Sequence, residues 1–426
     1  MIDASTSAAP RSGRTGAAST SRRLVLLCEH FYPEMISTGM HMTELATRLA
    51  GLGWRITVLT AKPSWGTDDD APVPREMVHE GVRIVRVPTI GSQKGGLASK
   101  AVAAASYVVS VSWALVTRRN DYEGMLVTTN PPFVGMLAWL ISKVTRRPYL
   151  LLVYDVFPEF AISLGVISDD SWIAKAWRRA FRLTLTGAAV TVVIGRDMRE
   201  LIRGKMPRRL HDRIVMIPNW SDERRVRPMG DGRNPFREEH TPEGAFVVQY
   251  AGRLGEKHTL EPLIDAACRL RDTDVWFQFV GDGAQRPRLE ALVAEHDLRN
   301  VQFLPYQPMD RLSEMLSAAD VAFVCLERGH TGISVPSKAY GVIASGTPII
   351  GILDPQGEIG LMIQETGCGT IVEPNGEDLA TAIEDLRDHS ERRRAMGEAG
   401  RTAFLDGYTL EAAAERYHAA LSSMLG

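Results

Sequence analysis

The sequence YAGRLGEKHTLEPLIDAA, residues 250–267, decides the fold of this chain. An apolar strand carrying Val247, Val248 and Tyr250 runs through a turn with two glycines into a helix that starts near Thr259. Glycine lets the backbone approach a ligand closely, and the N–H groups and dipole of a helix N-terminus favour phosphate. The pattern therefore indicates an anion site at a strand end, or a solvated loop.

Two cations in this loop suit a nucleotide diphosphate. Arg253 carries a planar guanidinium that can hold two phosphate oxygens, and Lys257 adds a mobile point charge. We expect both to stabilise a diphosphate leaving group, while Gly252 and Gly255 let the main chain approach it. The alternative is a pair of surface cations.

The composition is that of a soluble globular protein of two domains, with 426 residues, 45% of them hydrophobic and 23% charged. Residues 1–220 hold 28 Lys and Arg against 18 Asp and Glu, a balance of +10, whereas residues 221–426 hold 21 against 33, a balance of −12. A basic first half indicates an anionic partner, either membrane headgroups or nucleic acid. Since no nucleic-acid module is recognisable, we expect no nucleic acid.

Strand and helix patterns alternate along the chain, which predicts an α/β protein with parallel, doubly wound sheets. Residues 22–220 form the first domain, residues 243–407 the second, and residues 221–242 an Arg-, Asp-, Pro- and Gly-rich linker. Residues 1–21 look like a disordered tail rather than a signal peptide, and residues 408–426 form a last helix.

Two segments concern membrane contact. Residues 101–116 are apolar but shorter than the roughly 20 residues that a span needs, so we expect a buried or interfacial helix. Residues 172–182 combine tryptophans with cations, which is typical of a helix on an anionic membrane surface and also of a packed helix with a basic face. We favour a cytoplasmic protein, peripheral at the inner face of the plasma membrane, and the scattered cysteines agree with that compartment.

Carboxylates follow an apolar strand in LLVYDVFPEF, residues 151–160. The carboxyl ends of parallel strands line the ligand crevice, so Asp155 is a candidate to orient an acceptor hydroxyl or accept its proton, and Glu159 a candidate to bind the acceptor. The alternative is an acidic pair that complements a helix dipole.

Several loops are open to two interpretations. Gly281 and Gly283 lie in VGDG, which lacks the third glycine of a dinucleotide fingerprint and is either a ligand-facing loop or a simple turn. Ser337 and Lys338 lie at a helix start and are candidates to bind a sugar hydroxyl or a phosphate; the alternative is that Ser337 is an ordinary helix cap. The acidic residues 68–70 lie in a loop, as do Asp272 and Asp274, so we expect neither a metal nor a cofactor.

The order of motifs resembles that of retaining glycosyltransferase family 4, which has the GT-B fold of two facing Rossmann-like domains. The resemblance rests on HFYPE, STG, ELATRLAGLGWRITVLT, YDVFPE, IPNW, AGRLGEKHTLE, VGDG, VQFLPY and PSKAYGVIASGTPII. It is strongest to the bacterial capsule, O-antigen and colanic-acid subgroup, which includes fucosamine transferases. The implied activity transfers a sugar from a nucleotide-diphosphate sugar to a lipid-linked or saccharide acceptor, with retention.

The resemblance places the acceptor in the first domain, with Gly39 facing the reacting sugar, and the donor diphosphate on Arg253 and Lys257. The expected donor-binding residues are Gly252, Gly255, Gly281, Gly283, Tyr306, Ser337 and Lys338. The last helix is expected to cross back to the first domain. A non-hydrolysing sugar-nucleotide epimerase, which shares the twin-domain architecture, is one alternative. Many members carry two glutamates where this chain has Ile333 and Gly341, so a non-catalytic sugar-nucleotide-binding protein is the other.

Overall fold

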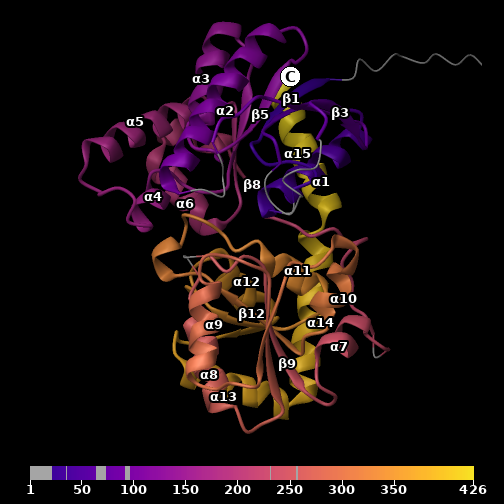
Figure 1. Ribbon diagram of the computed structural model, residues 1–426. Helices are drawn as coiled ribbons and strands as arrows, with labels where there is room; N and C mark the ends of the chain where they lie inside the picture. Colours follow the sequence, from indigo (N-terminus) through magenta and orange to yellow (C-terminus); the bar gives the residue numbers. More distant parts are fainter. Residues whose placement is uncertain (1–21, 35, 64–72, 92–95, 231, 256–257) are drawn as a thin grey trace, which may run out of the picture.

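Two α/β domains make up the chain, one above the other in Figure 1. The computed structural model describes residues 22–34, 36–63, 73–91, 96–230, 232–255 and 258–426. The expected tail at residues 1–21, the acidic loop at residues 68–70 and the cation Lys257 lie outside these ranges. The prediction of an α/β protein with two doubly wound sheets is confirmed.

The first domain is built on a sheet ordered β3-β4-β2-β1-β5-β6-β7-β8, in which β3 is antiparallel to β4 and the other neighbours are parallel. Its strands are β1 (Arg23–Leu27), β2 (Arg55–Thr60), β3 (Glu76–His79), β4 (Val82–Arg86), β5 (Gly124–Thr128), β6 (Tyr149–Val153), β7 (Val190–Val193) and β8 (Ile214–Met216). Its helices are α1 (Ser37–Gly51), α2 (Leu97–Thr117), α3 (Val134–Thr145), α4 (Glu159–Ser163), α5 (Trp172–Gly187) and α6 (Arg196–Lys205). Strands β5, β6 and β7 are buried along their whole length, as strands rich in Val and Leu between two helical layers require.

The second domain has a parallel sheet ordered β11-β10-β9-β12-β13-β14. Its strands are β9 (Phe246–Ala251), β10 (Val275–Val280), β11 (Val301–Leu304), β12 (Val321–Cys325), β13 (Ile349–Ile352) and β14 (Gly369–Ile371). The helices that follow the first domain are α7 (Pro235–His240), α8 (Glu261–Arg269), α9 (Arg286–Glu295), α10 (Leu312–Ser317), α11 (Lys338–Ala344), α12 (Glu358–Thr366), α13 (Gly376–Asp388), α14 (Ser390–Gly407) and α15 (Leu410–Leu425).

Strand order reverses at the central strand of each sheet, β1 in the first and β9 in the second. At this point the connections from two adjacent strands run to opposite faces of the sheet, and a crevice opens between them at the carboxyl ends of the strands. Ligands of doubly wound folds bind in this crevice. The loops after β1 and β9 are therefore the places where the fold positions a site.

Helix α15 joins the two domains. It runs from the second domain up along the first, as the yellow helix of Figure 1 shows, and packs beside α1. Its buried Ala414, Tyr417 and Leu421 belong to the core of the first domain, and the indole Nε1–H of Trp54 donates to Nδ1 of His418 at 3.0 Å. The last helix therefore ties the two domains together.

The segment expected to be an unstructured linker contains helix α7. Asn234 caps it by accepting from the Arg237 N–H, Pro235 occupies its first turn, and Phe236 is buried against the second domain. Six residues are too few for an apolar period to show in the sequence, so composition alone indicated a linker.

Candidate functional site

The loops after β1, β6 and β12 meet between the two domains. The hydroxyl oxygens of Ser37 and Ser337 lie 2.8 Å apart, and the N–H of Val156 donates to the carbonyl of Ile333 at 3.0 Å. These residues follow the carboxyl ends of strands in both sheets, so the two ligand-facing edges lie against each other. The predicted site residues Ser337 and Gly39, the latter in the first turn of α1, are both at this junction.

An open pocket of about 250 Å³ lies at the same junction. Asp197 of α6 lines it from the first domain, and Ser334 and Asp354 line it from the second. Asp197 accepts the N–H of Gly332 at 2.9 Å, which holds the second domain's loop against the first domain.

Gly252, Gly281 and Gly283 bring two strand-end loops of the second domain into direct contact. The N–H of Gly252 donates to Val280 at 2.8 Å, and the N–H of Leu254 donates to Asp282 at 2.9 Å. A Cβ on Gly281 would lie 2.1 Å from the Gly252 oxygen, and one on Gly283 would lie 2.3 Å from the Leu254 oxygen. Gly281 and Gly283 thus allow the loop after β10 to support the loop after β9.

Cationic and aromatic groups surround the loop after β9. The ammonium of Lys338 lies 3.6 Å from the centre of the Tyr250 ring and 3.6 Å from the position of a Cβ on Gly252. The Tyr250 hydroxyl donates to the Arg253 carbonyl at 2.6 Å, which fixes the loop. The side chain of Arg253 is exposed. The structure thus brings Gly252, Arg253 and Lys338 together.

Tyr306 lies on the other side of this loop. Its hydroxyl donates to the Asp282 carbonyl at 3.3 Å. Partial burial raises the pKa of Tyr306, and the charge of Arg253 opposes that rise, so these two side chains are close enough to interact. Gly255 is buried, and a Cβ there would make only ordinary contacts with the His258 ring, so this position does not require glycine.

The helix N-terminus expected near Thr259 begins two residues later. Helix α8 starts at Glu261, whose carboxylate pairs with Arg288 at 3.1 Å, and Pro262 lacks an N–H in the first turn. A carboxylate already complements the helix dipole there. Among the described groups, the cations Arg253 and Lys338 therefore favour an anion here more than the tip of α8 does.

His30 and Glu34, in the loop after β1, were not singled out from the sequence. The Nδ1 of His30 lies 2.9 Å from a carboxylate oxygen of Glu34, and both side chains are buried. Burial acts to lower the pKa of His30, but the hydrogen bond and charge of Glu34, with the charge of Glu29, raise it above its ordinary value. The charge of Arg253 opposes that rise. The sequence signal was a His and a Glu directly after the central strand.

Asp155 and Glu159 have different surroundings. The backbone N–H of Asp155 donates to the Thr129 hydroxyl at 3.2 Å, at the carboxyl ends of β5 and β6, and its side chain is half-buried. Glu159 starts α4 and forms ion pairs with Lys205 of α6 and Arg178 of α5. These ion pairs hold the Glu159 carboxylate between helices of the first domain.

Ile333 and Gly341 replace the glutamates that the resemblance leads one to expect. Ile333 packs against the core of the first domain, besides accepting from Val156. Gly341 lies inside α11, where a Cβ would meet Leu316 at 3.4 Å. Ile333 therefore contributes to the contact between domains.

Exposed apolar side chains, which together we call the apolar surface of the first domain, are concentrated on α2, α3 and α5, of which α3 contacts the other two. Of the 16 large apolar side chains exposed among the described residues, 11 lie between residues 102 and 173, so this surface is a local feature. It includes Val109 and Trp113 of α2, Val144 of α3 and Trp172 of α5. No helix within the described ranges is long and apolar enough to cross a membrane.

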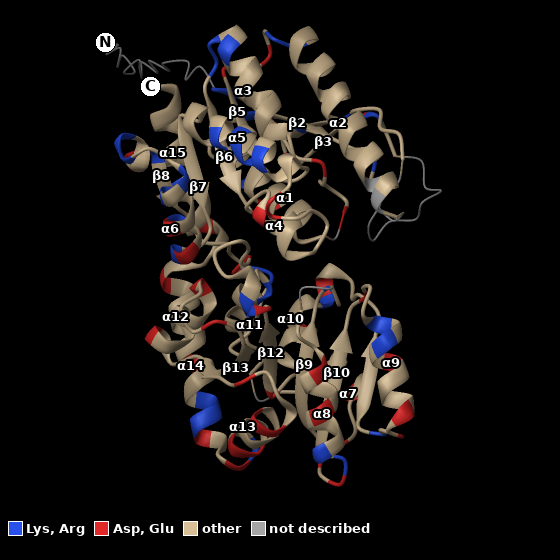
Figure 2. Cartoon of the chain, turned by 90° about the vertical axis from the view of Figure 1, so that its left-hand side faces the viewer, with Lys and Arg blue, Asp and Glu red and all other residues tan. Residues whose placement is uncertain are grey.

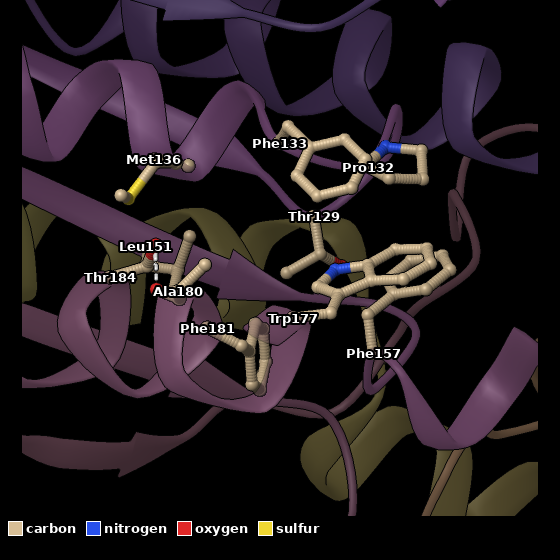
Figure 3. Close-up of a pocket in the computed structure, with 11 residues that line it drawn as sticks. Thr129, Pro132, Phe133, Met136, Leu151, Phe157, Trp177, Ala180, Phe181 and Thr184 are labelled. Atoms are coloured by element: carbon tan, nitrogen blue, oxygen red, sulfur yellow. Dashed lines mark hydrogen bonds between the residues drawn. The ribbon is translucent and has the colours of Figure 1, made fainter. Parts of the chain in front are cut away.

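Aromatic rings form a narrow pocket between α3 and α5, shown in Figure 3. The ring of Trp177 stacks on Phe157 with centroids 5.3 Å apart and on Phe133 with centroids 4.7 Å apart. The pocket adjoins the basic helix α5, whose cations are blue in Figure 2.

Comparisons with known proteins agree with this architecture. The family "Glycosyl transferase 4-like domain" matches residues 38–220, and "Glycosyl transferases group 1" matches residues 233–403. "Probable glycosyltransferase WbjE" of Pseudomonas aeruginosa is 31% identical, over 78% of this chain and 83% of that protein. "Putative colanic acid biosynthesis glycosyl transferase WcaI" of Escherichia coli K12 is 25% identical, over 83% of this chain and 89% of that protein. The structure of Anabaena Alr3699/HepE in complex with UDP-glucose superposes with a TM-score of 0.71 at 15% identity, over 94% of this chain and 99% of that chain.

Two facing Rossmann-like domains with a site between them define the GT-B class, and the predicted GT-B fold is confirmed. The chain belongs to the glycosyltransferases, with a 4-like first domain and a group 1 second domain. Among the described residues, no three His, Cys, Asp or Glu side chains are grouped to hold a metal ion. That the enzyme needs no metal or cofactor stays a prediction.

Proposed function

We propose that this glycosyltransferase moves a sugar from a nucleotide-diphosphate sugar to a lipid-linked or saccharide acceptor, with retention, in the synthesis of a cell-surface polysaccharide or glycolipid. The observation that supports the proposal is that Lys338 lies beside Gly252, the neighbour of Arg253, where Ser337 meets Ser37 of the first domain. Cations beside an open backbone loop suit a diphosphate.

The reaction breaks the bond between the anomeric carbon and a phosphate oxygen and forms one from that carbon to the acceptor oxygen. Negative charge grows on the diphosphate as the first bond breaks, and we assign its stabilisation to Arg253 and Lys338. In a retaining transfer the acceptor attacks on the face that the diphosphate leaves, so the acceptor proton passes to the departing phosphate oxygen. The contact of Ser37 with Ser337 joins the two domains beside the site.

The names of related proteins support the assignment to polysaccharide synthesis. WcaI is named for colanic acid biosynthesis, and a structure of HepE contains UDP-glucose. The apolar surface of the first domain, with the exposed cations of α5, supports contact with an anionic membrane at the cytoplasmic face.

A donor screen that detects released nucleoside diphosphate tests the proposal. With the donor found, Arg253→Ala is expected to lower turnover about a hundredfold, the order seen for the loss of one charge-stabilising donor. Arg299→Ala is the matched control, because Arg299 is an exposed cation of the same domain with a side chain 90% exposed. Wild-type turnover of Arg253→Ala would refute the role of this cation, and inverted product configuration by NMR would refute retention.

A further inference from the structure

We propose that His30, held by Glu34 after the central strand β1, binds the donor diphosphate from the first domain, together with Arg253 of the second. This inference rests on the proposed nucleotide-diphosphate donor and adds a residue of the other domain to its site. His30 follows the strand at which the order of the first sheet reverses. The carboxyl end of such a strand lines the ligand crevice.

The ring of His30 is held at one nitrogen and open at the other. Its Nδ1 lies 2.9 Å from a carboxylate oxygen of Glu34, and the two side chains are only 8% and 2% exposed. Its Nε2 forms no hydrogen bond within the part of the chain that the structure describes, yet it is not one of the buried atoms that lack a partner, so it reaches solvent. A carboxylate that orients one ring nitrogen leaves the other aimed at a ligand.

The charges around His30 indicate which ligand suits this open nitrogen. Burial acts to lower the pKa of His30, but Glu34 and Glu29 raise it, so the ring keeps its proton and its positive charge to a higher pH than an ordinary histidine does. The charge of Arg253 acts against that rise, so these cations of different domains are close enough to repel each other. An anion bound by both relieves the repulsion, and a charged N–H donates well to a diphosphate oxygen.

The other groups that interact with His30 or with Glu34 have different roles. Arg86 of β4 interacts with the charge of Glu34, but its guanidinium donates to two backbone carbonyls at 2.8 and 2.9 Å. The Cys28 thiol donates to the His30 carbonyl at 3.0 Å, and burial raises its pKa to about 12, so it stays neutral. His30 is therefore the group of this cluster that has a donor left for a ligand.

Two further histidines lie in or beside the site, and their rings are already engaged. The Nδ1 and Nε2 of His41 contact the carbonyls of Ser37 and Trp220 at 2.7 and 3.2 Å. The Nδ1 of His258 accepts the N–H of Gly255 at 3.2 Å. The test must therefore assign any proton change to His30 by substitution.

This arrangement predicts that the protein takes up protons when the diphosphate binds. A bound anion stabilises the charged ring, so binding raises the pKa of His30 further. Between the free and bound pKa values, each binding event takes up part of a proton, about half for the effect of a single nearby charge. A histidine that only supports the fold would not couple its proton to the ligand.

Titration calorimetry of the full chain measures this uptake. We would use UDP, GDP, dTDP, CDP and ADP in buffers of different ionisation enthalpy, from about pH 6.5, the ordinary pKa of histidine, upwards. Protons from the terminal phosphate of the nucleotide are common to all variants, so differences between variants report His30. Wild type is expected to take up about half a proton more than His30→Gln, whose amide can donate but cannot ionise. His30→Gln should also bind about tenfold more weakly at pH about 7, because a charged hydrogen bond becomes a neutral one.

Two further variants control for the fold and for other histidines. His296→Gln removes an exposed histidine of the second domain, and its uptake and affinity should equal those of wild type. Glu34→Gln keeps a hydrogen-bond partner for His30 but removes the charge, so the uptake should move to lower pH. This shift identifies His30 even if His30→Gln folds poorly.

Two kinds of result would contradict the inference, and they differ in what else they contradict. Equal uptake by wild type and His30→Gln, or an uptake whose pH range is unchanged in Glu34→Gln, overturns the role of His30 and leaves the proposed donor intact. If none of the five nucleotides binds, the proposed donor is overturned and the role of His30 with it.

Discussion

Replacing Gly281 by alanine should push the loop after β10 away from the loop after β9, which it contacts. The new Cβ would lie 2.1 Å from the Gly252 oxygen, whereas real Cβ atoms essentially never approach within 3.0 Å, so the loops must move apart by about 0.9 Å, the difference between these distances. Gly281 also has φ +139°, a conformation that alanine rarely adopts. The movement would stretch the 2.8 Å bond from the Gly252 N–H to Val280.

Two matched variants separate strain from steric clash. Gly244 has φ +78° with nothing within 4 Å of a new Cβ, so Gly244→Ala should cost only the strain, about 1 kcal/mol. Gly283 has no positive φ, but its Cβ would lie 2.3 Å from the Leu254 oxygen, so Gly283→Ala should cost about 2 kcal/mol for the clash. Gly281→Ala combines the backbone strain with the steric clash and should lower the free energy of unfolding by about 3 kcal/mol.

Urea unfolding of the second domain measures these losses in the free energy of unfolding. Calorimetry with the donor that the screen identifies measures binding. Because the loop after β9 carries Arg253, a displacement of about 1 Å should lower turnover of Gly281→Ala about a hundredfold at temperatures where it stays folded. Gly244→Ala should turn over like wild type. A Gly283→Ala protein as stable and active as wild type would refute the claim that these glycines hold the two loops together.

Three further predictions concern charged groups. Lys338→Met should weaken nucleoside diphosphate binding at least tenfold by calorimetry, because the proposed diphosphate site loses a cation, and should cost only about 1 kcal/mol of stability for the lost contact with the Tyr250 ring. The pKa of His30 is higher in the folded than in the unfolded state, so its pair with Glu34 stabilises the folded protein fully below pH about 6.5. This stabilisation is lost as the pH rises through the folded-state pKa. Glu34→Gln should abolish this pH dependence of the free energy of unfolding. Arg196 donates to buried Glu358 at 2.9 Å across the domains, so Arg196→Ala should cost about 3 kcal/mol in thermal unfolding, and adding Glu358→Gln should recover part of it.

The doubly wound fold was predictable because its signals are local. RITVLT at residues 55–60 is a strand by composition alone, and the structure gives β2 the same bounds. The edge strand β3 was missed because its exposed EMVH shows no apolar run, and α7 was missed because it is only six residues long. Helix α8 starts at Glu261 rather than near Thr259, and Pro262 stands in its first turn, where proline is favoured.

By itself, the sequence determined which residues follow strand ends, and this identified Gly252, Arg253 and Lys338 through glycine turns and cations next to apolar runs. Only the tertiary structure decided that Gly281 supports a neighbouring loop, that Ile333 packs on the first domain, and how the two strand-end loops oppose each other. The physical reason is that periodicity and turn chemistry act over a few residues. Contacts between side chains hundreds of positions apart exist only after two domains have docked.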